Sequence, residues 1–327
     1  MSHAVTVRVP ASTSNLGGGF DCVGVAVDRW LEVTVTLPLG RAGFTVERRG
    51  TLTSYTGAAA DDRLVTGFVA ACGRAARKVP DAVAFDATST IPVGRGLGSS
   101  AAATLAGVIA ANSLLELALS DLAVATLAAE LEGHPDNTAP ALFGGARLAL
   151  TGADRSLVIT PLDIHESLAL VFAIPDFSVE TAAARAVLPP ALPHATATRA
   201  AALGAALVQG LATANERLLA LALDDVLHVP FRRRLIAGYD AVTTAAQHAG
   251  AFGATLSGSG STIVAIAPVG AAAQVARSMV AAWKAQGIAA ESFVNPAGVG
   301  GAVVTRADHA PSHGASPGRS RQPGITV

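Results

Sequence analysis

Residues 92–103 read Pro-Val-Gly-Arg-Gly-Leu-Gly-Ser-Ser-Ala-Ala-Ala, and this stretch decides how the rest of the chain is interpreted. Its glycines allow the backbone to curl, and its serines stand where an alanine-rich helix is expected to begin. The first turn of a helix has amide groups without an internal partner and carries the positive end of the helix dipole. The stretch therefore predicts a loop that binds phosphate through main-chain amides.

Two common phosphate-binding patterns differ from this stretch. It lacks the Gly-Lys-Ser/Thr end of a Walker loop and the Gly-x-Gly-x-x-Gly spacing of a dinucleotide-binding fold. A glycine-rich turn with a serine helix cap is the structural alternative. In the functional interpretation, Ser99 and Ser100 offer an oxygen to the phosphates or to their magnesium ion.

Composition narrows the class of protein. The chain has 327 residues, of which 51% are hydrophobic and 14% charged, so we expect a globular protein long enough for two domains. A formal net charge of -1 argues against a nucleic-acid or membrane-surface partner. No signal peptide and no run of ~20 apolar residues is present, and Cys22 and Cys72 are too few for a disulfide framework. A cytoplasmic protein is expected.

Strands and helices are mixed along the chain without strict alternation, which favours the α+β class. Strands are expected at 4–9, 31–37, 44–48, 83–88, 145–150, 157–162, 168–174, 254–267 and 289–294. Helices are expected at 62–78, 100–117, 121–131, 195–223, 232–249 and 271–286. Residues 44–48 are expected to pair with 31–37 across the turn at 38–43.

A break near 156–167 divides the pattern into two units. We expect one domain over 1–160, with the glycine-rich loop, and a second over 161–305. The final stretch, 306–327, is rich in Pro, Gly, Ser and His, and is expected to be a disordered tail.

Three further segments concentrate polar residues. Residues 10–28 bring Asn15, three consecutive glycines and Asp21 to a turn between strands, where an Asx turn is the alternative interpretation. Residues 130–137 end a helix with Glu132, His134, Asp136 and Asn137. A carboxylate there could complete a magnesium site with a serine of the loop, or the segment is a polar helix end. Residues 253–262 interrupt a strand with Gly-Ser-Gly, typical of a bulge or tight hairpin, or of another backbone surface facing a ligand.

Taken together, these segments resemble the GHMP family of small-molecule kinases. The three family blocks stand in order at 15–21, 92–102 and 253–262, and the run Gly133-His134-Pro135-Asp136-Asn137 resembles a signature for a hydroxy amino acid substrate, L-homoserine. The resemblance implies an N-terminal ribosomal-protein-like α+β domain, a C-terminal ferredoxin-like α/β sandwich, and a cleft between them for ATP and substrate. It also implies phosphorylation of the L-homoserine hydroxyl on the way to threonine.

The resemblance assigns roles to individual residues. The ATP phosphates would be bound by the loop residues Pro92, Val93, Gly94, Arg95, Gly96, Leu97, Gly98, Ser99, Ser100, Ala101 and Ala102. Glu132, which precedes a glycine as the family glutamate does, would hold Mg²⁺ with Ser99 or Ser100. The amino-acid pocket would contain Asn15, Asp21, His134, Asp136, Asn137, Thr181, Arg185, Arg232 and Gly258.

Charge supports this division of the pocket. An ammonium group needs an anion such as Asp21, and a carboxylate suits the planar guanidinium of Arg185 or Arg232. Arg233 and Arg234 adjoin Arg232, and a shift of register would exchange them. For His134 alone, a structural hydrogen bond is favoured over catalysis.

In the mechanism that the resemblance implies, Asp136 or Asn137 orients the acceptor hydroxyl for in-line attack, and no strong base is required because the transition state is loose. Glu132 and Arg185 complete the catalytic set. The chain departs from the family at Arg63-Leu64-Val65, where Asn-Leu-Val is frequent, so the adenine contacts of that segment do not carry over directly. Homodimers occur in the family, although no feature of this sequence demands one. A related kinase for another small alcohol, and a non-catalytic regulator that binds ATP or an amino acid, are the alternatives.

Overall fold

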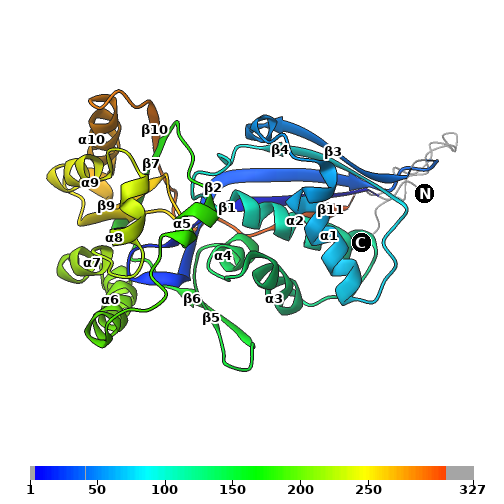
Figure 1. Cartoon of the computed structure of the whole chain (residues 1–327), viewed down its shortest axis with the longest axis horizontal. Helices are drawn as coiled ribbons and strands as arrows, with labels where there is room; N and C mark the ends of the chain where they lie inside the picture. Colours follow the sequence, from blue (N-terminus) through cyan, green and yellow to red (C-terminus); the bar gives the residue numbers. More distant parts are fainter. Residues whose placement is uncertain (1–3, 41, 307–327) are drawn as a thin grey trace, which may run out of the picture.

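Two sheets organise the chain in the computed structural model, which describes residues 4–40 and 42–306 (Figure 1). Within these residues the larger sheet has seven strands, in the order β11-β1-β2-β4-β3, with β5 paired to β2 and β6 paired to β5. Its strands are β1 (Ala4–Asn15), β2 (Gly19–Thr36), β3 (Gly43–Gly50), β4 (Ala82–Ser89), β5 (Ala146–Thr151), β6 (Leu157–Leu162) and β11 (Val303–Arg306).

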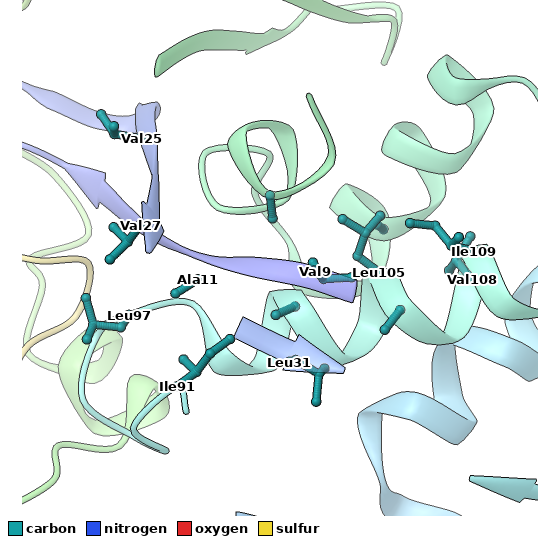
Figure 2. Packing of buried hydrophobic residues seen from close by; sticks show 14 of the residues in the cluster. Val9, Ala11, Val25, Val27, Leu31, Ile91, Leu97, Leu105, Val108 and Ile109 are labelled. Atoms are coloured by element: carbon teal, nitrogen blue, oxygen red, sulfur yellow. The ribbon is translucent and has the colours of Figure 1, made fainter. Parts of the chain in front are cut away.

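Four helices accompany the larger sheet: α1 (Arg63–Arg74), α2 (Ser99–Leu114), α3 (Asp121–Glu132) and α4 (Thr138–Phe143). Helices α2 and α4 contact its strands β1 and β2, and α1 and α3 pack against α2. Helix α2 contacts β1 on one side and α1 and α3 on others, which explains why its sequence is apolar nearly all round. Figure 2 shows Val9 of β1 beside Leu105 of α2, both buried in the main core. This packing holds the middle of α2 against the middle of β1.

The smaller sheet has the order β10-β7-β9-β8 among the described residues. Its strands are β7 (Leu168–Pro175), β8 (Gly253–Leu256), β9 (Ile263–Pro268) and β10 (Ala290–Val294). Every residue of β7 is buried, as expected for a strand covered on both faces. The accompanying helices are α5 (Thr181–Ala186), α6 (His194–Thr213), α7 (Glu216–Leu223), α8 (Val229–Arg232), α9 (Tyr239–His248) and α10 (Ala272–Lys284).

The expected pairing of 44–48 with 31–37 is wrong. Strand β3 instead pairs in parallel with β4, with Phe44 opposite Val83. The short helices η1 (Thr51–Ser54) and η2 (Ala59–Asp61), followed by α1, carry the chain from β3 to β4. A parallel pair needs such a crossover, and α1 provides it. β2 instead lies between β1 and β4.

Two long helices expected from the sequence are divided in the structure. The expected helix at 195–223 stops at Ala214, whose φ of 52° is left-handed, and α7 begins after the side chain of Asn215 caps it. The expected helix at 232–249 separates into α8, a short 3-10 turn and α9, because Gly238 has a φ of 77°. The expected strand at 254–267 is the hairpin of β8 and β9, with the Gly-Ser-Gly segment at its tip.

After the smaller sheet, the chain returns to the larger one, because β11 pairs antiparallel with β1. The division of the chain near residue 160 stays a prediction. Of the expected tail, residues 307–327 lie outside the described residues, while Arg306 ends β11. Among the described helices, even α6, the longest at 20 residues, lacks the apolar character that a membrane-spanning helix needs.

Candidate active site

Three glycine-containing segments, far apart in the sequence, meet between the two sheets. The hydroxyl of Ser257 donates to the carbonyl of Gly96 (2.7 Å) and lies 2.8 Å from the hydroxyl of Thr13. The amide of Gly258 donates to the carbonyl of Ser14 (3.1 Å). The tip of the β8–β9 hairpin therefore joins the end of β1 to the loop before α2, and the three predicted blocks form one site.

The loop before α2 turns its carbonyl groups away from the site. The carbonyls of Gly94, Arg95 and Leu97 accept from the amides of Val179 (3.1 Å), Thr262 (3.1 Å) and Ser12 (3.2 Å). Within the described part of the chain, no amide from 93 to 101 donates to a protein acceptor. The φ angles of Gly94, Gly96 and Gly98 are 69°, 75° and 67°, which only glycine adopts freely. The loop thus presents unpaired donors at the start of a helix.

A cavity of about 530 Å³ opens in front of this loop, within the size range of small-molecule sites. The predicted loop residues that line it are Val93, Gly94, Gly96, Gly98, Ser99, Ser100 and Ala101. Pro92, Arg95, Leu97 and Ala102 do not line it. Leu97 and Ala102 are core residues, and burial lowers the pKa of Arg95, whose guanidinium donates to the carbonyls of Pro175 and Asp176. Side-chain contact with phosphate is therefore not expected from these four residues.

A carboxylate faces the first turn of α2. The hydroxyl of Ser100 donates to the carboxylate of Glu132, 3.0 Å from Oε1 and 2.9 Å from Oε2, and Thr104 donates to the same Oε1 (2.7 Å). The side chain of Glu132 is 8% exposed. Glu130, by contrast, is exposed and pairs with Arg74. Carboxylate and hydroxyl oxygens are the hard ligands that Mg²⁺ prefers, so this donor set fits the ion.

The contacts of Glu132 add two details that the sequence analysis did not provide. Ser99 lines the cavity, but Ser100 is the serine that contacts Glu132. Thr104 was missed, although its place one helical turn after Ser100 was a usable signal.

The turn between β1 and β2 presents Asp21 to the cavity. The side chain of Asn15 accepts from the amide of Asp21 (3.0 Å) and donates to the carbonyl of Gly258 (2.9 Å). Asn15 and Asp21 have left-handed φ angles of 74° and 55°. The carboxylate of Asp21 forms an ion pair with Arg185 of α5 (3.0 Å). The predicted anion and one predicted cation of the pocket are thus in direct contact.

Arg232 lies in the cavity wall and is only 2% exposed. Its Nε donates to the carbonyl of Ala184 (3.0 Å), and its Nη1 lies 3.3 Å from the carbonyl of Gly258 and 3.4 Å from Nδ1 of His228. Burial, followed by the charge of Arg185, lowers the pKa of Arg232. Among the described residues, no carboxylate lies within ion-pair distance of it.

The adjacent residues Arg233 and Arg234 lie outside the cavity wall. Arg233 is exposed and pairs with Asp240 (3.3 Å), and neither Arg233 nor Arg234 lines the cavity. Of the three adjacent arginines, Arg232 is therefore the one that faces the site.

His134, Asp136 and Asn137 line the cavity between Glu132 at one end and Arg232 at the other. The side-chain Nδ2 of Asn137 donates to Ser14 Oγ (3.0 Å), and its Oδ1 accepts from the hydroxyl of Ser12 (2.9 Å). Both polar atoms of the Asn137 side chain therefore have hydrogen-bond partners. Asp136 is 1% exposed, and its Oδ1 forms a hydrogen bond with Nδ1 of His134. Burial lowers the pKa of His134, but the hydrogen bond and charge of Asp136, with the charge of Asp21, outweigh burial and raise it overall.

Sequence reasoning missed much of the wall at the other end of the cavity. Residues there come from β3, from η1 and η2 and from the start of α1: Arg48, Leu52, Tyr55, Asp61, Asp62 and Leu64. Arg63, noted only as a departure, also lines the cavity. The remaining predicted residues, Thr181 and Gly258, line its opposite end, with the hydroxyl of Thr181 3.4 Å from that of Ser259.

Comparison with known proteins gives consistent results for both halves of the chain. Residues 63–145 match the family described as GHMP kinases N terminal domain, and residues 203–285 match GHMP kinases C terminal. A homoserine kinase from Synechococcus sp. is 40% identical over 290 residues, 89% of this chain and 94% of the relative. One from Microchaete diplosiphon is 42% identical over 288 residues, 88% of this chain and 93% of the relative.

Solved structures agree with the sequence relatives. The crystal structure of a homoserine kinase from Cytophaga hutchinsonii superposes with a TM-score of 0.81 at 29% identity, covering 92% of this chain and 97% of that one.

Proposed function

The chain belongs to the GHMP kinase family, and we propose that it transfers the γ-phosphate of ATP to the side-chain hydroxyl of L-homoserine, giving O-phospho-L-homoserine and ADP for threonine biosynthesis. One observation carries the nucleotide half of the proposal. The amides from 93 to 101 have no acceptor among the residues that the structure describes, while the loop carbonyls at Gly94, Arg95 and Leu97 accept hydrogen bonds from other segments. Such a loop at the start of α2 suits a polyphosphate.

Magnesium is assigned to Glu132 and Ser100, whose oxygen atoms meet beside the loop. When bound there, the ion would neutralise charge on the phosphate oxygens and help to orient them. Thr104 holds Glu132 in place through its hydrogen bond to Oε1 (2.7 Å). Ser99 is the alternative hydroxyl, since it lines the same cavity.

The amino-acid group of the substrate is assigned to the other end of the cavity. Asp21, held by Asn15, would accept from the ammonium group. Arg185 and Arg232 would bind the carboxylate, and the guanidinium of Arg232 is already buried without a carboxylate partner among the described residues. His134, Thr181 and Gly258 complete this end of the wall.

The chemical step requires the substrate hydroxyl oxygen to attack the γ-phosphorus while the bond to the ADP oxygen breaks, and the hydroxyl proton is released to solvent. Oδ1 of Asp136 is bonded to His134, whereas Oδ2 has no donor within the described residues, so Oδ2 can accept from the hydroxyl and orient it. Because the transition state is loose, orientation and charge neutralisation contribute more than proton removal. Asn137, engaged by Ser12 and Ser14, acts as a positioning residue.

The proposal also assigns the reaction to the cytoplasm, where ATP is available and where the free cysteines Cys22 and Cys72 would stay reduced.

ADP release, coupled to a spectroscopic assay, tests the proposal with L-homoserine, mevalonate, galactose and shikimate as acceptors. We expect L-homoserine to have the highest kcat/KM. A higher value for another alcohol would reject the substrate, and ligand-induced thermal stabilisation without ADP formation would reject catalysis.

A further inference from the structure

Arg63 occupies a defined place at the wall of the cavity. It is the first residue of α1, directly after Asp62, whose Oδ1 caps the helix by accepting from the amide of Leu64 (3.0 Å). The same carboxylate fixes Arg48 through its Oδ2 (2.7 Å). This anchored start of α1 places Arg63 Nη1 3.9 Å from Glu132 Oε1, opposite the first turn of α2.

Three other described arginines at or near the cavity already have hydrogen-bond or ion-pair partners. Arg48 donates twice to Asp62 and lies over the ring of Tyr55 at 5.0 Å, and Arg185 pairs with Asp21. Arg95, within the loop itself, is directed to the carbonyls of Pro175 and Asp176.

Arg232 has no carboxylate partner, but it contacts Gly258 and Ala184 at the amino-acid end. Arg63 differs from all of these. Its side chain is 48% exposed and lines the cavity, and the one ion pair that it makes among the described residues, with Glu132, spans 3.9 Å, which is beyond hydrogen-bond distance.

The loop at 93–101, to which the phosphates are assigned, presents no cationic side chain to the cavity among the described residues. It contains no lysine, and the chain has lysine only at 78 and 284. Main-chain amides supply partial charges, while the nearby Glu132 is an anion. A nucleoside triphosphate carries several negative charges, and the magnesium ion offsets only part of them. A guanidinium suits the remainder because it donates in parallel to two phosphate oxygens.

We propose that Arg63 is a further catalytic residue that binds the terminal phosphates of the nucleotide from the side opposite the bare amides of 93–101. This inference rests on the proposed function and adds a phosphate ligand to it. As charge moves toward the ADP oxygen during transfer, the guanidinium would stabilise that charge.

Variants at Arg63 test this assignment. Arg63→Asn removes the charge, Arg63→Lys keeps it without the two-point geometry, and Arg74→Asn is the matched control on α1, with Arg74 paired to Glu130 outside the cavity. Calorimetric titration would measure the affinity for a nonhydrolysable ATP analogue and for adenosine. Each titration would be made with Mg²⁺ and again with EDTA. Thermal unfolding would verify that each variant folds.

We expect Arg63→Asn to bind the ATP analogue about tenfold or more weakly, which corresponds to the loss of a charged hydrogen bond. The loss should persist in EDTA and be absent for adenosine. Arg63→Lys should recover part of the affinity, and Arg74→Asn should match the unmodified chain. In turnover with L-homoserine, kcat should fall for Arg63→Asn.

Three results would overturn the inference. An unchanged affinity in Arg63→Asn would show that Arg63 does not touch phosphate. An equal loss for adenosine would assign it to the base, and a loss seen only with Mg²⁺ would mean that it acts by holding Glu132. Failure of the unmodified chain to phosphorylate L-homoserine would instead reject the proposed function, so the two failures can be told apart.

Discussion

Asp21 and Arg185 form a two-point ion pair in the cavity wall, with Nη2–Oδ1 at 3.0 Å and Nη1–Oδ2 at 3.2 Å. In the proposed function these side chains serve opposite ends of a zwitterion, so without substrate they neutralise each other. Both are partly exposed, at 36% for Asp21 and 40% for Arg185. Such a pair contributes only about 0–1 kcal/mol, so an amino acid can exchange it for two new contacts at low cost.

Replacement of Arg185 by Ala should therefore affect substrate binding far more than stability. We expect the KM for L-homoserine to rise about tenfold or more, because a two-point carboxylate contact is lost. The free energy of unfolding should change by less than about 1 kcal/mol. Steady-state kinetics and urea unfolding measure the two effects, with Arg199→Ala, which breaks the exposed pair to Asp224, as the control. An unchanged KM would indicate an acceptor without a carboxylate.

Replacement of Glu132 by Ala should abolish most of the magnesium-dependent turnover. Glu132 is the carboxylate bonded to Ser100 and Thr104, and in the proposed function its loss removes a hard ligand of the ion. We expect kcat to fall by about a hundredfold or more. Glu130→Ala is the matched control, because Glu130 is exposed and pairs with Arg74. Full activity of Glu132→Ala over a magnesium titration would show that the metal is held elsewhere.

Local rules explain why the shape of the loop before α2 could be predicted from sequence. Glycine spacing and the start of an alanine-rich helix determine the left-handed turns at Gly94 and Gly98 and the free amides that follow. The choice of Glu132 over Glu130 also followed from a local signal, the glycine after it. Of these two carboxylates, Glu132 contacts Ser100 and Glu130 pairs with Arg74, and the assignment of the metal to Glu132 stays a prediction.

Long-range choices explain what could not be predicted. The crossover through α1 determines that β3 pairs with β4, and the residues 44–48 themselves carry no pattern that specifies this partner. The wall formed by Arg48, Tyr55 and Asp62 has the same origin, because these residues meet through the contact between β3 and the start of α1. Such side chains have no spacing motif, so their place depends on the tertiary fold.

Replacement of Gly96 by Ala should weaken both stability and nucleotide binding. Gly96 has a φ of 75°, and a Cβ atom there would clash with the carbonyl oxygen of Ser257 and lie 2.8 Å from the carbonyl oxygen of Gly260. We expect a loss of about 1–3 kcal/mol in the free energy of unfolding, with weaker binding of the ATP analogue. Gly73→Ala in α1 is the control, because its Cβ would meet nothing within 4 Å. The free energy of unfolding of Gly73→Ala should rise by about 0.5–1 kcal/mol. A similar rise for Gly96→Ala would contradict the constraint on the backbone at Gly96.

Cys22 lies beside Asp21 yet should be chemically inert. Burial, followed by the charges of Asp136 and Asp21, raises the pKa of its thiol to about 11, so little thiolate exists at neutral pH. Cys22→Ser should retain nearly full activity, and iodoacetamide at pH 7.5 or below, more than about three units under that pKa, should inactivate the enzyme slowly if at all. Rapid inactivation that Cys22→Ser prevents would contradict this expectation.

The pair of His134 and Asp136 predicts how stability depends on pH. Burial lowers the pKa of His134, but Asp136 and Asp21 raise it above the ordinary value of 6.5. A histidine whose folded pKa is raised contributes stability fully below 6.5 and loses it as pH rises through the folded pKa. Relative to His134→Asn, the intact chain should therefore lose unfolding free energy as the pH rises above 6.5 and through the raised pKa of the folded state, measured by urea unfolding. In an NMR titration, Asp136→Asn should lower the pKa of His134, since burial is then opposed only by Asp21; an unchanged value would show that Asp136 does not hold the proton.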